Sequence, residues 1–127
     1  ALETIEKEQA QGTKFFFINS TSSSSPIGLL AIDTIPDEET GGVELHKLYT
    51  DKAYWGKGVG QAALCFATEV ALQAGAKYIE LRVNRCNTRA VSAYMRNGFY
   101  KHREVCLDIG NGFVMDDFIM RKDIKLQ

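Results

Sequence analysis

Three glycines at alternate positions, Gly56, Gly58 and Gly60, lie between a short apolar segment and a long helical pattern. Glycine has no Cβ, so the backbone can come within hydrogen-bonding distance of a ligand. The first N–H groups of a helix have no partner within it, and the helix dipole favours negative charge there. The turn therefore predicts an anion site such as a pyrophosphate binds. A glycine-rich turn without a ligand would have the same sequence, so the turn alone does not decide between these readings.

The residues before this turn are expected to form a β-meander. Residues 14–19, 26–33 and 43–50 are short, rich in β-branched and aromatic side chains, and separated by turn-forming segments. Residues 2–10 carry charges between apolar positions in a spacing that is compatible with the end of an amphipathic helix. The opening of the chain is thus predicted as a helix end followed by three strands.

The residues after the turn change their apolar period from two to about 3.6. This pattern predicts a helix over residues 59–74, a strand over 77–83 and a second helix over 87–97. Residues 99–106 and 113–122 then predict a hairpin. The expected order is βββ-α-β-α-ββ, which indicates a mixed α/β (α+β type) fold with a mostly antiparallel sheet flanked by helices.

Composition limits the class of protein. A chain of 127 residues, 45% apolar and 24% charged, fits one globular domain over residues 1–127. Fifteen basic and sixteen acidic side chains give a net charge of −1, which disfavours a nucleic-acid partner. No apolar run is long enough to cross a bilayer, so we expect no membrane partner. Three cysteines fit no disulfide framework, and with two histidines they show no metal-ligand spacing, which favours a metal-free protein of the cytoplasm.

A dinucleotide is one candidate ligand for the turn. Residues 58–63 satisfy the G-x-G-x-x-[GA] pattern, and Glu80 lies 22 residues after Gly58. However, the five residues 51–55 separate the predicted strand from the first glycine, whereas a dinucleotide turn follows its strand directly. The predicted elements also leave too few parallel strands for a doubly wound sheet. A dinucleotide-binding oxidoreductase is therefore the weaker alternative.

Coenzyme A is the second candidate ligand. Residues 55–60, Trp-Gly-Lys-Gly-Val-Gly, resemble the pyrophosphate motif of the GNAT superfamily of acyl-CoA-dependent N-acetyltransferases. That motif is Arg or Gln, two residues, Gly, one residue, then Gly or Ala. Trp55 departs from it at the first position and cannot supply the Arg or Gln side chain. Downstream, Asn87, Ala90, Tyr94 and the Gly-Phe pair at 98–99 have the spacing of the family's second signature.

The resemblance implies an acyl-CoA N-acyltransferase fold whose two central strands splay after the glycine turn. It further implies direct transfer of an acetyl group from acetyl-CoA to an amine, in a small molecule or a peptide. Asn87 is also a plausible helix N-cap without any ligand. The residues that the resemblance assigns to acetyl-CoA are Leu48, Tyr49, Thr50, Trp55, Gly56, Lys57, Gly58, Val59, Gly60, Asn87 and Tyr94.

Such a transfer needs a neutral amine. An alkyl amine with a pKa near 10.4 costs about 4.6 kcal/mol to hold neutral at pH 7, so a base or a desolvated site is required. Alternation puts Glu44, His46, Leu48 and Thr50 on one strand face, with Glu44 and His46 roughly 7 Å apart. Glu44 and His46 are both candidate bases, but a solvated carboxylate and a structural histidine would give the same pattern. A β-bulge would change which side chains share a face.

Tyr94 matches the family position of the phenol that protonates the departing thiolate, although a core tyrosine would show the same spacing. Family members usually have a first strand and one or two helices before the segment that matches residues 14–19, where this chain has thirteen residues. Those helices commonly build one wall of the acceptor site. The resemblance therefore predicts one of two arrangements: the chain is a fragment that lacks the first strand and helix, or a partner supplies this wall. The resemblance also suggests a homodimer. The alternative of another class is a catalytically silent acyl-CoA-binding module.

Overall fold

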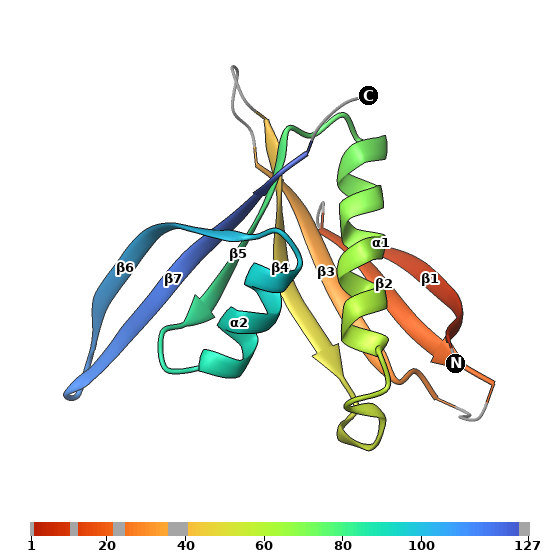
Figure 1. Ribbon diagram of the computed structural model, residues 1–127, viewed down its shortest axis with the longest axis horizontal. Helices are drawn as coiled ribbons and strands as arrows, with labels where there is room; N and C mark the ends of the chain where they lie inside the picture. Colours follow the sequence, from red (N-terminus) through yellow and green to blue (C-terminus); the bar gives the residue numbers. More distant parts are fainter. Residues whose placement is uncertain (1, 11–12, 22–24, 36–40, 125–127) are drawn as a thin grey trace.

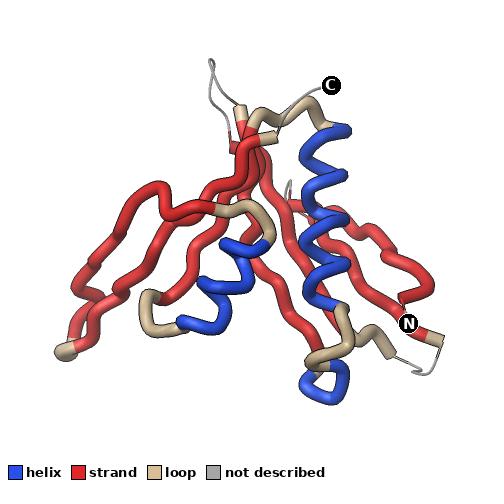
Figure 2. Tube along the Cα trace, in the orientation of Figure 1, coloured by secondary structure: helices blue, strands red, loops and turns tan. Residues whose placement is uncertain are grey.

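A computed structural model describes residues 2–10, 13–21, 25–35 and 41–124 of the chain. These residues form one seven-stranded sheet with two α-helices (Figures 1 and 2). In chain order the elements are β1 (Leu2–Ala10), β2 (Thr13–Ser20), β3 (Gly28–Ile35), β4 (Gly42–Thr50), the 3₁₀ turn η1 (Lys52–Tyr54), α1 (Val59–Gln73), β5 (Tyr78–Asn84), α2 (Thr88–Arg96), β6 (Tyr100–Gly110) and β7 (Phe113–Asp123).

The sheet divides into two halves that meet at the pair β4–β5. The strand order is β1-β2-β3-β4-β5-β7-β6, and among the described strands only β4 and β5 pair in parallel. Their pairing covers three positions, from Val43 opposite Ile79 to Leu45 opposite Leu81. Beyond these positions the two strands diverge, which gives the inverted V of Figure 1. The expected splaying of two central strands is confirmed.

Both helices pack on the same face of the sheet and bury one apolar core. The buried face of α1 includes Ala63, Ala67 and Ala71, whose small side chains let the helix lie close to the strands. Val91 is the buried residue of α2, and it belongs to the same core cluster. α1 therefore packs against β4, and α2 follows β5 in the chain, on either side of the divergence.

The expectation for residues 2–10 is wrong, because they form β1 and not a helix. β1 pairs antiparallel with β2, from Leu2 opposite Ser20 to Ala10 opposite Thr13. Unpaired N–H and C=O groups along the outer edge of β2 need partners, and a neighbouring strand supplies them as a continuous ladder. Helix propensity is a weak preference that such pairing overrides. A strand therefore precedes residues 14–19, and the order is ββββ-α-β-α-ββ.

The remaining elements agree with the sequence predictions to within a few residues. Both helices end before a glycine with positive φ, Gly75 after α1 and Gly98 after α2. The last hairpin is longer than predicted, since β6 continues to Gly110 and Asn111 and Gly112 make the turn, both with positive φ. No described helix is long and apolar enough to cross a membrane.

Gly42, at the start of β4, packs directly under an aromatic ring. A Cβ at this position would lie 2.3–2.6 Å from ring atoms of Tyr78, and the Arg121 guanidinium lies 3.8 Å from the centroid of the same ring. We expect Gly42→Ala to lower the free energy of unfolding by about 1–3 kcal/mol, because the buried ring must move. Urea unfolding measures this change. The same substitution at Gly60, where a Cβ would meet nothing within 4 Å, is the matched control, and an equal loss in both variants would contradict the steric explanation.

Candidate active site

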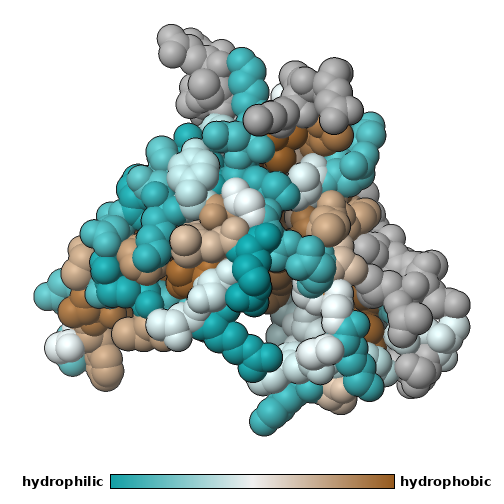
Figure 3. Space-filling view, viewed as in Figure 1, coloured by the Kyte–Doolittle hydropathy of each residue, from teal (hydrophilic) through white to brown (hydrophobic). Residues whose placement is uncertain are grey.

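The diverging strands leave a cleft between them that continues along both helices. One part, of about 410 Å³, lies between β4 and β5 and is lined by Leu45, His46, Arg82, Val83 and Tyr94, among others. A second part, of about 560 Å³, runs from the end of β4 to the glycine turn and along α2. Leu48, Tyr49, Asn87, Ala90 and Tyr94 line both parts, so the two form one continuous groove. Figure 3 shows a notch between α2 and the turn before α1.

The glycine turn brings the N-terminus of α1 to one end of the groove. Gly56 and Gly58 have positive φ, and Gly58, with φ 82°, is the residue that precedes the helix. No side chain caps this helix, so its first N–H groups are free for a ligand. A Cβ built at Gly56, Gly58 or Gly60 meets nothing within 4 Å, which leaves open space above the turn. The local geometry is that of an anion site.

Strand β4 has an unpaired edge where it lines the groove. Its pairing with β3 continues to Thr50, whereas its pairing with β5 stops at Leu45. Backbone groups between these positions, on the β5 side, are therefore open to the groove and can pair with an extended ligand as an added strand would. The carbonyl oxygen of Thr50 already accepts a hydrogen bond of 2.9 Å from the indole N–H of Trp55, which holds the exposed Trp55 at the groove.

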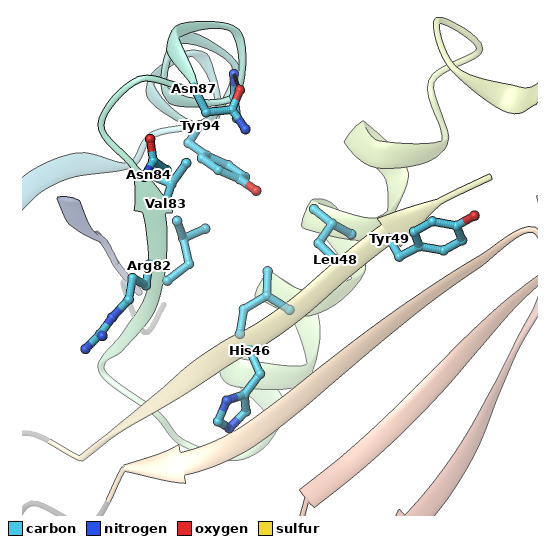
Figure 4. Close-up of a pocket in the computed structure, with 11 residues that line it drawn as sticks. His46, Leu48, Tyr49, Arg82, Val83, Asn84, Asn87 and Tyr94 are labelled. Carbon is cyan, nitrogen blue, oxygen red and sulfur yellow. Dashed lines mark hydrogen bonds between the residues drawn. The ribbon is translucent and has the colours of Figure 1, made fainter. Parts of the chain in front are cut away.

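A β-bulge in β4 corrects the expected arrangement of its side chains. Leu30 lies opposite Leu48 and Ile32 lies opposite Leu45, so Leu45 and Leu48 share a face although they are three residues apart. The extra residue is His46, since Lys47 lies opposite Ala31 and Leu45 lies opposite Ile32. Glu44 and His46 do share a face, but Leu48 and Thr50 lie on the other one, contrary to strict alternation. Figure 4 shows Leu48 and His46 leaving β4 on opposite sides.

Tyr94 of α2 projects from the opposite wall of the groove. Its ring is half-buried and packs against Phe99, with ring centroids 5.8 Å apart. The hydroxyl points across the cleft toward Leu48 (Figure 4) and makes no hydrogen bond to another described residue. Burial raises the pKa of Tyr94 above its ordinary value, because the phenolate would be poorly solvated. The group is therefore a protonated phenol at neutral pH that is available as a proton donor.

Asn87 caps α2 and lines the groove at the same time. Its side-chain oxygen accepts a hydrogen bond of 3.2 Å from the Ala90 N–H, which confirms the predicted N-cap, while its position puts the side-chain amide at the cleft. All the residues expected at a cofactor line the groove except one. Lys57 is outside both lining sets, and its Nζ lies 5.7 Å from the ring centroid of Tyr54.

The groove also contains residues that sequence reasoning missed. Arg89 and Arg96 of α2 line its outer part, together with Gln61 of α1. The two arginines are seven residues apart, which is two turns of a helix, so their common face could have been read from the predicted helix over 87–97. They bring positive charge to the end of the groove where the N-terminus of α1 lies.

The two candidate bases belong to a cluster of three side chains. The Nδ1 atom of His46 lies 3.2 Å from Oε1 of Glu44 on the same strand. The Nε2 atom of His46 hydrogen bonds to the carboxylate of Asp33 on β3, a residue that the sequence did not single out. His46 lines the cleft, whereas Glu44 and Asp33 do not. No group of three metal-binding side chains with metal-site geometry occurs among the residues that the structure describes.

The groove therefore combines four chemical elements: an anion site at a helix N-terminus, an open strand edge, a half-buried phenol and a histidine with two carboxylates. Phosphate binding at one end and proton transfer at the other are the chemistry of a group transfer from a phosphate-bearing carrier. The lining residues come from β4, the turn before α1, and α2, which are the segments that the sequence analysis singled out. That these residues form a site, and the role of each side chain, stay predictions.

Comparison with known proteins identifies the family. The sequence model of the acetyltransferase (GNAT) family matches residues 2–99. An uncharacterized N-acetyltransferase of Methanocaldococcus jannaschii is 33% identical over 89 residues, which cover 66% of this chain and 38% of that protein. The chain thus spans less than half the length of this curated relative.

Solved structures agree with this assignment. Nourseothricin acetyltransferase superposes with a TM-score of 0.76 at 20% identity, covering 91% of this chain and 67% of that one. The PaiA N-acetyltransferase of Thermoplasma acidophilum, solved with coenzyme A, gives 0.67 at 27% identity, covering 88% and 61%. The ribosomal-protein-S18-alanine N-acetyltransferase of Escherichia coli gives 0.73 at 18% identity, covering 94% and 74%. The fold expected from the two sequence signatures is confirmed, and the chain belongs to the acetyltransferase (GNAT) family.

Proposed function

We propose that this chain transfers the acetyl group of acetyl-CoA directly to an amine acceptor. The observation that supports this most strongly is the continuous groove from the uncapped N-terminus of α1 to the Tyr94 hydroxyl. A groove with an anion site at one end and a phenol farther along suits an extended carrier with phosphate at one end and a reactive group at the other. The PaiA N-acetyltransferase of T. acidophilum, which is 27% identical, was solved with coenzyme A, and we extend that ligand to this chain.

Each part of the groove has a role in this proposal. The N–H groups of Val59 and Gly60 hold the pyrophosphate, and Arg89 and Arg96 supply positive charge for the phosphates. The open edge of β4 from Leu48 to Thr50 pairs with the pantetheine arm through main-chain groups, and the Asn87 amide adds a side-chain contact. Acetyl-CoA supplies an activated thioester when it is bound.

Two proton transfers are left to side chains. Tyr94 donates a proton to the departing sulfur, which suits a phenol that burial keeps protonated. Glu44 and His46 accept a proton from the incoming amine on the other side of β4. A catalytically silent acyl-CoA-binding module would bind the same ligand without turnover. Measuring coenzyme A release from acetyl-CoA with a panel of amines and peptides distinguishes the two.

The acceptor is an amine in a small molecule or a peptide. The names of two structural relatives contain an antibiotic and a ribosomal protein, but at 20% and 18% identity these relatives share the fold alone with this chain. With a net charge of −1 the chain has no excess positive field, so we do not propose a nucleic-acid acceptor.

Thermal unfolding with acetyl-CoA, coenzyme A, NADH, NADPH and ATP tests the proposed ligand. A ligand at 100 times its dissociation constant stabilises the folded state by about 2.7 kcal/mol. We expect a rise in Tm of several degrees with the two coenzyme A species, and no rise with the nucleotides that lack pantetheine. Stabilisation by NADH or NADPH alone would contradict the proposal and favour the dinucleotide reading of the glycine turn.

A further inference from the structure

Both ring nitrogens of His46 face carboxylates. Nε2 contacts the carboxylate of Asp33 on β3, and Nδ1 lies 3.2 Å from Oε1 of Glu44 on β4. The bulge in β4 creates this arrangement, because it makes His46 an extra residue beside the register pair Asp33–Glu44. The three side chains come from two adjacent strands and lie on the sheet face away from the helices. His46 is the member of the cluster that lines the cleft.

Counting protons shows what this cluster can do. Ionised carboxylates only accept hydrogen bonds, and a neutral imidazole has one N–H donor. One of the two contacts of His46 can therefore be a hydrogen bond in the neutral form, while both are hydrogen bonds in the imidazolium form. If Asp33 accepts the hydrogen bond from the Nε2 proton, the second proton lies between Nδ1 and Oε1. That proton is present in the imidazolium form and absent in the neutral form.

The surroundings favour Asp33 as the fixed partner. A hydrogen bond from the Thr13 hydroxyl of β2, joined by His46, lowers the pKa of Asp33 below its ordinary value, so Asp33 stays ionised. On the adjacent strand β5, Glu80 is neutralised by Arg121, whose guanidinium nitrogens lie 2.8 and 3.2 Å from one carboxylate oxygen. Arg82 of β5 is the other charged side chain on this face that lines the cleft.

We propose that Asp33 is a positioning residue that fixes the tautomer of His46, so that His46 Nδ1 and Glu44 Oε1 share the one proton exchanged with the acceptor amine. The proton-transfer role of this cluster rests on the proposed acetyltransferase function, whereas the contacts of His46 with the two carboxylates do not. In the proton-transfer step an N–H bond of the acceptor ammonium breaks, and its proton moves to the site between Nδ1 and Oε1. The electron pair of that bond stays on nitrogen and becomes the attacking lone pair. The imidazolium that forms donates one hydrogen bond to each carboxylate.

The imidazole itself can be followed without any acceptor. We expect the NMR spectrum of the side-chain nitrogens of the full chain to show, for neutral His46, a proton on Nε2 and none on Nδ1. His102→Gln removes the other histidine signal and assigns the spectrum. Asp33→Asn removes a negative charge from beside the imidazolium. Neutral His46 should then lose its preference for the Nε2 tautomer, because an amide oxygen accepts that proton less strongly than a carboxylate does.

The matched control is Asp108→Asn, which makes the same charge change in the distant β6–β7 hairpin. It should leave the His46 tautomer as it is in the parent, since the Asp108 carboxylate accepts its hydrogen bond from the Gly110 N–H within that hairpin. An unchanged tautomer ratio in a folded Asp33→Asn variant would overturn the proposal. If this variant does not fold, Asp33→Glu keeps the charge at an altered distance and must change the tautomer ratio, or the proposal fails.

Turnover provides the second readout once an acceptor is known. Asp33→Asn should lower kcat, while the KM for acetyl-CoA and the Tm stay close to those of the parent. A merely structural role would lower the Tm and raise the KM together with the loss of kcat. Wild-type protein that binds coenzyme A but shows no transfer would contradict the proposed function, while the imidazole tautomer would still decide the role of Asp33.

Discussion

Replacing Tyr94 with Phe should lower kcat by about 10²- to 10⁴-fold, the range that a positioned general acid contributes. The substitution removes one hydroxyl, which points across the cleft and bonds to no other described residue, and leaves the ring packed on Phe99. Folding and coenzyme A binding should therefore stay within about twofold of the parent. Steady-state release of coenzyme A measures the loss, and thermal unfolding measures the stability.

Tyr100→Phe is the matched control for this variant. Tyr100 lies on β6 outside the groove, and its hydroxyl donates a hydrogen bond of 3.1 Å to Asp123. Removing that hydroxyl should leave kcat unchanged within about twofold. If the Tyr94 variant keeps more than about a third of the parent kcat, the phenol is not the proton donor to sulfur, and Tyr94 is a packing residue of α2.

Gly60→Ala should weaken coenzyme A binding by about tenfold or more, equivalent to 1.4 kcal/mol. Gly60 lines the groove in the first turn of α1, and an added Cβ meets no protein atom within 4 Å, so the methyl group occupies ligand space. Without ligand the variant should be as stable as the parent or slightly more stable, since alanine favours a helix over glycine by roughly 0.5–1 kcal/mol. Isothermal calorimetry with coenzyme A measures the affinity.

Gly58→Ala separates this steric effect from backbone strain. Gly58 has φ 82°, so alanine there should cost about 1–2 kcal/mol of folding free energy in addition to any loss of affinity. Gly60 does not have positive φ. Equal affinities of the Gly60 variant and the parent for coenzyme A would show that the ligand does not approach the turn.

Most of the fold after the glycine turn could be predicted, because each element there has a local signal. The helical period of residues 59–74 and the glycine that follows fixed α1 to within a residue. The N-cap predicted at Asn87 gave the start of α2, and the side-chain oxygen of Asn87 accepts a hydrogen bond from the Ala90 N–H. The hairpin of β6 and β7 was placed correctly but too short, because exposed strands carry no alternation between buried and exposed sides.

Residues 2–10 were predicted incorrectly for a physical reason. These residues form a strand because their backbone pairs with the edge of β2. The amino acids of residues 2–10 do not show that such an edge is available. The charges of Glu3, Glu6 and Glu8 fit a helix surface and an edge strand equally well. Short amphipathic segments therefore stay ambiguous until their neighbours are known.

The location of the groove could be predicted from the sequence, whereas the roles of its side chains stay predictions. The residues that the resemblance assigned to acetyl-CoA line the groove, except Lys57, whose ammonium lies over the Tyr54 ring. The bulge at His46 could not be read from residue types, because it is a register shift against β3. For the same reason no residue pattern pointed to Asp33, which contacts His46 only through the pairing of the two strands.

The most direct test of the central claim is a titration of the ¹⁵N-labelled chain with coenzyme A, followed by amide chemical shifts. Binding in the groove predicts the largest shifts at the amides of residues 58–60, at residues 48–50 of β4 and at the start of α2 near Asn87. The amides of β1 and of the turn at residues 111–112 should stay unchanged. Saturable shifts confined to residues outside the groove, or none at millimolar coenzyme A, would contradict the assignment of this groove as the acetyl-CoA site.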